Sequence, residues 1–570
     1  MSTPNSANHS RAVALRSSDT VMRLARMGAF HQTRLSFMRV LLRRLAADKW
    51  HFERPQWSID NAGVGTALYT AIGPERTYTL VAFAHDLDPK LRSDRVIAEA
   101  WDATFTLFDG KPSALDIERL RAVVPLQEAG HISARELTLS RANRSVRLFE
   151  SVVSTLASGR QPRAQDLDEV GYLMRTTAVY GSGKFGACDR RFIREREEFS
   201  APFQVELLTV FLIRAFSVDI VEHLARVSNP CAAVSLAPEL RRRVGVGNST
   251  GLGMAPFVVN HPTLVDRWVT VRETALARVR SVVQVESARR TRLVSFISRM
   301  HIDAQQWLTK HPEQAERVKA YRVDLDALLR QCTDWPLNEH PQPWNQLYCW
   351  AEKHLSMECQ EALVSALIEL YPELVDELSA RMHMDESASF DIDGSMPIAR
   401  LRALIERNYG FALDCDFDTP SNNARFWYAS EEKLEPRLGQ RFEEPGADRE
   451  HPLAIGRDVA ALFQFLQHDT EHKIVAELLL SATQHRHTVR RVQASANYTY
   501  AEIRDNLIAD LMLPIDILRF KLAFFGATKF DPRSDRWTRI TMFQNAPYPQ
   551  ELADGYVDDW VYPQALAPRP

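Results

Sequence analysis

Several features that specialised proteins depend on are missing from this sequence. Six cysteines are scattered over 570 residues without any C-x-x-C pair, which excludes a disulfide framework and the cysteine spacing of a structural zinc site. No apolar run approaches the roughly 18 residues that cross a bilayer, and we find no hydrophobic core of a signal peptide. These absences predict a reduced, cytoplasmic protein without a membrane partner.

Lysine and glycine are also rare. The chain has 11 lysines against 59 arginines, an excess of arginine that is typical of a GC-rich bacterial genome. Its 22 glycines fall well below the usual share of about 7%. Because both residue types are scarce, a place where they gather stands out as a candidate site.

Neither sign of charge dominates the whole chain, since 70 basic and 73 acidic residues give a formal net charge of -3. This balance gives no reason to expect a nucleic-acid partner. It hides an asymmetry, because residues 1–50 carry a net charge of +7 and the remaining residues carry -10. The basic start predicts a disordered tail followed by a basic amphipathic helix, and an organelle transit peptide is the alternative.

Hydrophobic periodicity predicts a mainly α (α+β) fold, with a large helical body and a small N-terminal antiparallel β-sheet. Period-2 alternation over 66–72 and 77–83, around Gly73-Pro74, predicts a hairpin, and 101–108 adds a third strand. Helical spacing takes over from about residue 113. It predicts a buried helix at 203–227, a long helix at 263–300, and helices at about 20–48, 313–332, 345–383, 396–408, 454–467, 471–496 and 500–525.

The same patterns divide the chain into five parts. They are a disordered tail at 1–20, the basic helix with the small sheet at 21–112, a helical core with two glycine-rich loops at 113–410, a polar loop or lid at 411–452, and a C-terminal helical region with a wrapping tail at 453–570.

The first glycine cluster matches G-x-G-x-x-G through Gly181, Gly183 and Gly186. A dinucleotide fold needs a strand before that motif and a helix directly after it. Here the preceding segment is predicted to be helical, and the 203–227 helix replaces the second strand. Walker A fails too, because Ala178 and Phe185 stand where a glycine and a hydroxyl residue belong. We therefore expect no nucleotide cofactor.

An anion site remains the functional interpretation of this cluster. A glycine-rich turn exposes backbone N–H groups, and a lysine adds positive charge. The structural alternative is a turn that ends a helix. The candidate residues here are Arg175, Thr176, Tyr180, Ser182 and Lys184.

The second glycine cluster spans residues 245–262 and contains four glycines in nine residues. Glycines let a ligand approach the backbone closely, and polar groups near a helix N-terminus suit an anion. A plain loop is the alternative. The candidate residues are Asn248, Ser249, Thr250, Asn260 and His261.

A third segment, 425–441, places alternating charges just after three aromatic residues. Such mixing can shift a carboxylate pKa toward neutrality, as acid–base chemistry requires, although a solvated charged loop is the commoner outcome. Its candidate residues are Glu431, Glu432, Lys433 and Arg437.

A fourth segment, His468-Asp-Thr-Glu-His472, matches H-x-x-E-H. This spacing resembles that of the inverted zinc proteases, with two histidines on one helical face, and His468-Asp469 resembles the central pair of the all-helical HD phosphohydrolases. Neither resemblance extends further, because no third ligand is evident. The alternative is a histidine-rich, exposed helix end.

These observations favour a cytosolic bacterial enzyme that acts on a small anionic metabolite, bearing carboxylate or phosphate, by lyase or hydrolase chemistry without a cofactor. Tyr180, Lys184 or His261 would move the proton, and the 425–441 segment would close over the site. A non-catalytic helical scaffold or ligand sensor, assembled as a homo-oligomer through the 263–300 helix, is the alternative. A metal-dependent hydrolase at His468–His472 is the second alternative.

Overall fold

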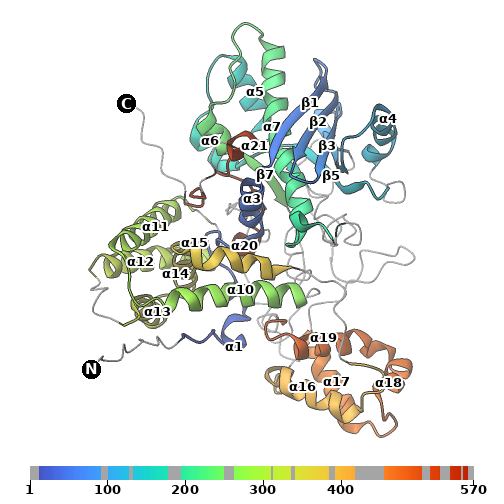
Figure 1. Ribbon diagram of the computed structural model, residues 1–570, viewed down its shortest axis with the longest axis vertical. Coiled ribbons are helices and arrows are strands. Elements are labelled where there is room, and N and C mark those ends of the chain that lie inside the picture. Colours follow the sequence, from blue (N-terminus) through green and yellow to red (C-terminus); the bar gives the residue numbers. More distant parts are fainter. Residues whose placement is uncertain are drawn as a thin grey trace, which may run out of the picture.

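The sheet of this protein draws strands from nearly the whole chain (Figure 1). The computed structural model describes residues 12–91, 100–126, 133–176, 193, 195–249, 262–307, 309, 312–334, 341–383, 392–416, 455–502, 514–526, 539–553, 556 and 558–562. Eight strands pair in the order in which they occur. They are β1 (His51–Ile59), β2 (Gly65–Ile72), β3 (Thr77–Ala84), β4 (Ala103–Asp109), β5 (Glu136–Arg144), β6 (Tyr172–Thr176), β7 (Gly245–Ser249) and β8 (Arg539–Met542).

The strands do not all pair in the same sense. Pairing is antiparallel from β1 to β6 and again between β7 and β8, whereas β6 and β7 run parallel. The prediction of a small N-terminal sheet in a mainly helical protein is therefore wrong. The fold is α+β with a large mixed sheet.

The sequence prediction found only the strands that alternate clearly. The hairpin of β2 and β3 and the third strand, β4, are confirmed. It missed the other five strands. Pro55 interrupts β1, and β6, β7 and β8 are too short to show a period. The strand β5 is as buried as β4, and its Leu137 and Leu139 alternate with polar residues, so a strand signal is present there that the prediction did not use.

The helix α7 (Gln204–Ser228) lies inside the curl of this sheet. Its Phe211 ring packs against Phe52 of β1 at 5.8 Å and against Phe543, which follows β8, at 5.2 Å between centroids. Phe216 packs against Phe105 of β4 at 5.3 Å. Because one helix touches both ends of the sheet, the sheet must wrap around it. The predicted buried helix at 203–227 is confirmed.

The convex face of the sheet carries a second, small apolar core. The helix α4 (Ala114–Val123), which begins at a capping box formed by Ser113 and Asp116, covers that face. The residues of this small core come from β2, β3, β4, β5 and α4, with Val124 just after α4: Leu68, Val81, Phe83, Phe108, Leu120, Val124 and Leu139. The helices α5 (Phe149–Ala157) and α6 (Ala164–Val170) link β5 to β6.

A helical body packs beside the sheet (Figure 1). It contains α10 (Pro262–Arg280), α11 (Ser287–Gln305), α12 (Pro312–Asp334), α13 (Pro343–His354), α14 (Met357–Glu369), α15 (Pro372–Val375) and η7 (Asp376–Met382). Nearly every residue of α14 is buried, so this helix forms the centre of the body.

The predicted long helix at 263–300 is wrong, because it is two helices, α10 and α11. The chain turns between them without proline or glycine, so helical spacing continued across the break. Trp268 and Val269 of α10 and Ile297 of α11 are fully buried within this chain. The apolar stripe that was expected to serve as a subunit interface therefore belongs to the core.

The basic N-terminal segment threads through this body. It forms α1 (Ser18–Val21), α2 (Leu24–Met27) and α3 (Phe37–Ala47) in place of one helix at 20–48, and α2 packs against α20 (Pro514–Phe525). Disorder was predicted over residues 1–20, yet Arg16 is buried and bonded to Glu273 and Glu361. Composition alone could not show that carboxylates far along the chain receive this arginine.

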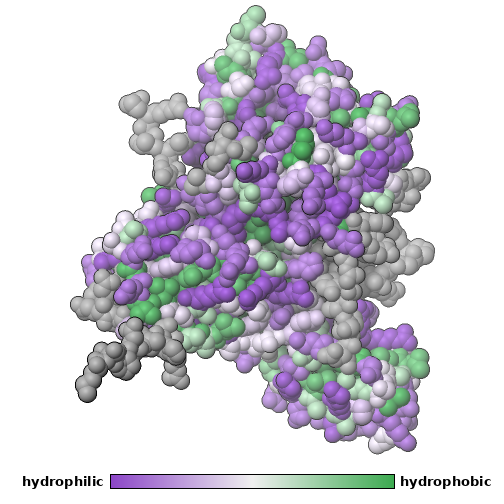
Figure 2. Space-filling model, in the orientation of Figure 1, coloured by the Kyte–Doolittle hydropathy of each residue, from purple (hydrophilic) through white to green (hydrophobic). Residues whose placement is uncertain are grey.

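The C-terminal helices form a separate group at the foot of Figure 1. This group contains α16 (Ile398–Leu413), α17 (Ile455–His468), α18 (Val475–Ser481), η9 (Thr483–His485) and α19 (Arg486–Asn497). Hydrophilic side chains cover much of the face shown in Figure 2. Within the described ranges, we find no helix with both the length and the apolar character that crossing a membrane would require.

Candidate functional site

The two glycine clusters follow neighbouring strands. The first cluster comes after β6 and the second begins within β7, and these strands lie side by side in parallel, with Thr176 opposite Asn248. They are joined through α7 and α8 (Pro238–Arg242), so they form a β-α-β crossover. The carboxyl ends of adjacent parallel strands are where ligands bind in many sheets. The segments that were chosen for their glycines therefore leave the sheet at one place.

This arrangement corrects one sequence argument. A helix was predicted before the Gly181 motif, but Tyr172–Thr176 form the strand β6. The prediction failed because β6 is short and fully buried and shows no alternation. The next α-helix that the structure describes, α7, begins at Gln204, and residues 177–192, which contain the motif, lie outside the described residues.

A row of polar side chains crosses the sheet on the side that faces α7. Thr138 of β5 bonds Thr209 of α7 at 2.9 Å between hydroxyl oxygens, and Ser140 bonds Thr176 at 2.8 Å. The Thr176 hydroxyl also lies 3.0 Å from the backbone oxygen of Arg141 and donates to it. Asn248 continues the row because residues opposite each other on paired strands share a face.

The Asn248 amide is the exception in this row. The residue is 1% exposed, and neither its Oδ1 nor its Nδ2 has a hydrogen-bond partner among the described residues. Asn143 of β5 is also 1% exposed, but its Oδ1 accepts from Asp102 N at 2.9 Å and its Nδ2 donates to Ala100 O at 3.3 Å. Buried amides normally bond to protein, water or ligand, so Asn248 has capacity for a ligand.

The remaining candidates of β6 and β7 are placed differently. Arg175 is 2% exposed, lies opposite Gly247, and projects from the face opposite to Thr176. The strand β7 ends at Ser249, whose side chain lies outside the described part of the structure. Arg175 and Asn248 thus do not share a face, although both lie near the ends of these strands.

Two glycines of the second cluster have a packing explanation. A Cβ on Gly247 would lie 2.6 Å from the Tyr172 ring, and one on Gly245 would lie 2.3 Å from the backbone oxygen of Met542. Close packing within the sheet, and not ligand approach, therefore requires glycine at both positions.

Many of the proposed residues cannot be placed. Outside the described residues lie Tyr180, Ser182, Lys184, Thr250, Asn260, His261, Glu431, Glu432, Lys433 and Arg437.

The histidine segment lies at the end of a helix. Because α17 ends at His468, the H-x-x-E-H residues do not share a helical face. The His472 ring bonds Asp469 Oδ2 through Nδ1 at 2.9 Å and Ser481 Oγ through Nε2 at 2.6 Å. Throughout the described part of the chain, no three His, Cys, Asp or Glu side chains gather as metal ligands.

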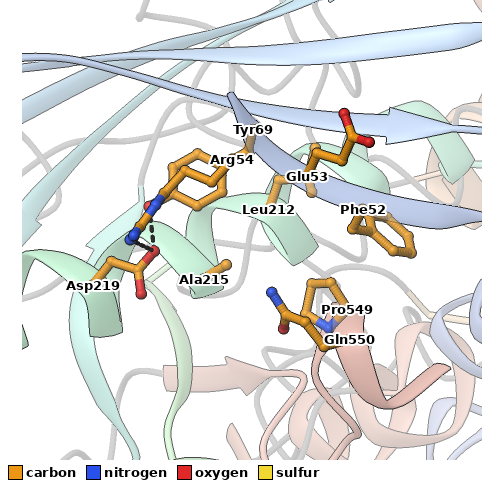
Figure 3. Close-up of a pocket in the computed structure, with 9 residues that line it drawn as sticks. All are labelled: Phe52, Glu53, Arg54, Tyr69, Leu212, Ala215, Asp219, Pro549 and Gln550. Atoms are coloured by element: carbon orange, nitrogen blue, oxygen red, sulfur yellow. Dashed lines mark hydrogen bonds and ion pairs between the residues drawn. The ribbon is translucent and has the colours of Figure 1, made fainter. Parts of the chain in front are cut away.

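A small cavity of about 220 Å³, which no sequence pattern indicated, lies at the β1 edge of the sheet (Figure 3). Asp219 of α7 accepts hydrogen bonds there from Tyr69 OH at 2.8 Å and from Arg54 Nη1 at 2.7 Å. Burial, then the neighbouring carboxylate, raises the pKa of Tyr69, so its hydroxyl stays protonated. The lining residues are Phe52, Glu53, Arg54, Tyr69, Leu212, Ala215, Asp219, Pro549 and Gln550.

Known proteins offer no parallel for either place. No family model matches the chain, and no curated protein or solved structure is significantly similar to it.

Proposed function

We propose that this protein is an enzyme that binds a small carboxylate- or phosphate-bearing metabolite at the carboxyl ends of β6 and β7. The conversion would be acid–base chemistry of the lyase or hydrolase type. One observation carries the proposal: the parallel strands that lead into both glycine clusters are adjacent, and the buried Asn248 amide, which has no hydrogen-bond partner among the described residues, lies there.

The chemistry of the row fits the binding of an anion. The Asn248 Nδ2 can donate two hydrogen bonds and carries no charge that would repel the ligand. Thr176 is held in place by Ser140 and the Arg141 backbone, so the side chain next to Asn248 is fixed before a ligand arrives. The Thr176 hydroxyl donates its proton to Arg141 O, so the donor that this row offers a ligand is the neighbouring Asn248 amide. The fixed neighbour leaves little ordering to be done on binding.

The charge and the proton transfer are assigned to residues that the sequence supplies nearby. Lys184 follows β6 and His261 follows β7 along the chain. In this proposal Lys184 neutralises the anion, and Lys184, His261 or Tyr180 exchanges the proton. A lysine or histidine with a pKa near the working pH is suited to that step.

The first experiment measures stabilisation by inorganic phosphate and by malonate, which are small probes of the two ligand classes. We expect at least one of them to raise the thermal midpoint, because a ligand that binds only the folded state stabilises it. In Asn248→Leu this increment should disappear. In the matched variant Asn143→Leu the midpoint without ligand should fall while the increment persists.

Two outcomes contradict the proposal. One is that neither probe shifts the midpoint of the unmodified protein. The other is that the increment survives in Asn248→Leu. Once a substrate is identified, unchanged turnover in both Lys184→Ala and His261→Ala would remove the proposed acid–base residues.

A further inference from the structure

The cavity at the β1 edge lies next to a bulge in that strand. The register of β1 on β2 shifts between Glu53 and Gln56, at a position that includes Pro55, which cannot donate to a ladder. Phe52 and Arg54 lie on the cavity side of β1, whereas the Glu53 side chain points to the opposite side, as expected for alternating strand residues (Figure 3). Bulges are frequent next to binding sites.

An ion pair with unused hydrogen-bonding capacity lies in the cavity. Both bonds to Asp219, from Tyr69 and Arg54, end on Oδ2. Within the described ranges, these two bonds leave Asp219 Oδ1 without a partner. The Arg54 guanidinium also interacts with Tyr69, and its remaining N–H groups are left for solvent or a ligand. The pair is partly open to solvent, with side-chain exposures of 45% for Arg54 and 24% for Asp219.

The other acidic residue of the lining does not compete for this pair. The Glu53 carboxylate accepts from His51 Nε2 at 3.1 Å, and Figure 3 shows it pointing away from Asp219. The cavity therefore presents one free carboxylate oxygen and free guanidinium N–H groups with no net charge. A lone anion or a lone cation would leave one partner of the pair facing a like charge.

The rest of the lining is mainly apolar. Leu212 and Ala215 of α7 face Phe52 and Pro549 across the cavity, and Pro549 and Gln550 belong to α21 (Pro549–Ala553). A volume of about 220 Å³ admits only a ligand smaller than the usual drug-sized occupant of a pocket.

We propose that this cavity binds a small zwitterion with an aliphatic side chain, the chemistry of a neutral α-amino acid. The ligand ammonium donates to Asp219 Oδ1, the ligand carboxylate accepts from the free N–H groups of Arg54, and the aliphatic group packs against Leu212 and Phe52. Charge balance favours this class, because each ligand charge meets its opposite in a pair that is already neutral.

Titration calorimetry with L-leucine as the probe tests the proposal. The comparison ligands are 4-methylpentanoate, which lacks the ammonium, and 3-methylbutylamine, which lacks the carboxylate. We expect L-leucine to bind and each comparison ligand to bind at least about tenfold more weakly, since each loses one charge-assisted contact. Equal binding of either comparison ligand overturns the zwitterion, and absence of L-leucine binding overturns the site.

Two variants locate the binding. Asp219→Asn keeps an acceptor for Tyr69 but removes the charge, and Ala215→Met fills the cavity without touching the ion pair, so both should weaken L-leucine binding about tenfold or more. The matched control is Asp166→Asn, which removes the carboxylate of the exposed pair with Arg163. Unchanged affinity in Ala215→Met, in folded protein, contradicts the proposal. Asn248→Leu should leave L-leucine binding intact, which separates this site from the strand-end site.

Discussion

The helical body and the curled sheet bury polar groups in different ways. In the body, carboxylates of α14 receive arginines from distant segments: Glu361 bonds Arg16 at 2.7 Å and also bonds Arg272, while Glu369 bonds Arg39 at 2.5 Å. In the sheet, the row that faces α7 is made of neutral hydroxyls and an amide. Charged pairs thus occupy the centre of the body, whereas this one row on the α7-facing side of the sheet is uncharged.

This difference relates to the charge asymmetry of the sequence, in which residues 1–50 carry +7 and the remainder carries -10. Five basic residues of the first 50 pair with acidic side chains from later in the chain: Arg16, Arg26, Arg34, Arg39 and Arg43. Removing one partner from a set of buried, paired charges leaves the others uncompensated, which strongly destabilises the fold. In the uncharged row, the Asn248 amide has no hydrogen-bond partner among the described residues, and a ligand can be accommodated beside it.

Removing the central carboxylate of the body should have the largest effect. Glu361→Ala leaves Arg16 and Arg272 buried without their shared partner, so we expect the free energy of unfolding to fall by about 3–5 kcal/mol. Urea denaturation measures it. The control is Glu377→Ala, which removes an acid that is 67% exposed and pairs with Arg278. That change should cost about 0–1 kcal/mol, and similar losses in both variants would contradict the contrast.

Acid should weaken the protein through the same region. Burial lowers the pKa of His31 from 6.5 to about 3, so below pH 6.5 the unfolded chain takes up a proton that the folded chain refuses. Stability then falls with decreasing pH by up to about 1.4 kcal/mol per pH unit. Burial alone would raise the pKa of Glu361, but the positive charges of Arg16 and Arg272 lower it from 4.5 to about 2. The stability that this carboxylate contributes is therefore lost as the pH falls below 4.5.

The carboxyl group of Asp303 acts in the opposite direction. Burial raises the pKa of Asp303 from 3.8 to about 6, so its protonation favours the folded state as the pH falls through 6. Free energies of unfolding measured at pH 7.5, 6, 5 and 4 give the combined effect of His31, Glu361 and Asp303. In His31→Phe the decline between pH 6.5 and 4 should flatten, and an unchanged decline would show that His31 is not its cause.

Sequence patterns predicted those parts of the fold in which burial and local periodicity agree. The β2–β3 hairpin is marked by the Gly73-Pro74 turn between two short runs of strand-forming residues, although both of its faces are buried. The helix α7 shows a continuous apolar run because the sheet surrounds it. The strand β6 gave no such signal, since five buried residues fit a helix equally well. Its position beside β7 depends on pairing across the whole of α7.

The two candidate sites differ in the same way: a local sequence pattern indicated one of them, and the other depends on residues that are distant in the sequence. Glycine scarcity pointed to the segments after β6 and within β7 and found Asn248, although packing against Tyr172 accounts for Gly247. The cavity was invisible, because Arg54 and Asp219 are 165 positions apart and meet only when the sheet curls around α7. No local pattern encodes that contact.

The smallest expected change concerns the two buried asparagines of the sheet, and it tests the neutral half of the comparison directly. Leucine has nearly the shape of asparagine, so Asn248→Leu removes an amide that bonds nothing described and should leave the stability of the ligand-free protein unchanged or raise it by up to about 1 kcal/mol. Asn143→Leu leaves Asp102 N and Ala100 O without partners and should cost about 1–3 kcal/mol. Urea denaturation of both variants measures the difference. Equal losses would mean that the Asn248 amide is bonded in the folded protein, and the sheet would then have no spare polar group for a ligand.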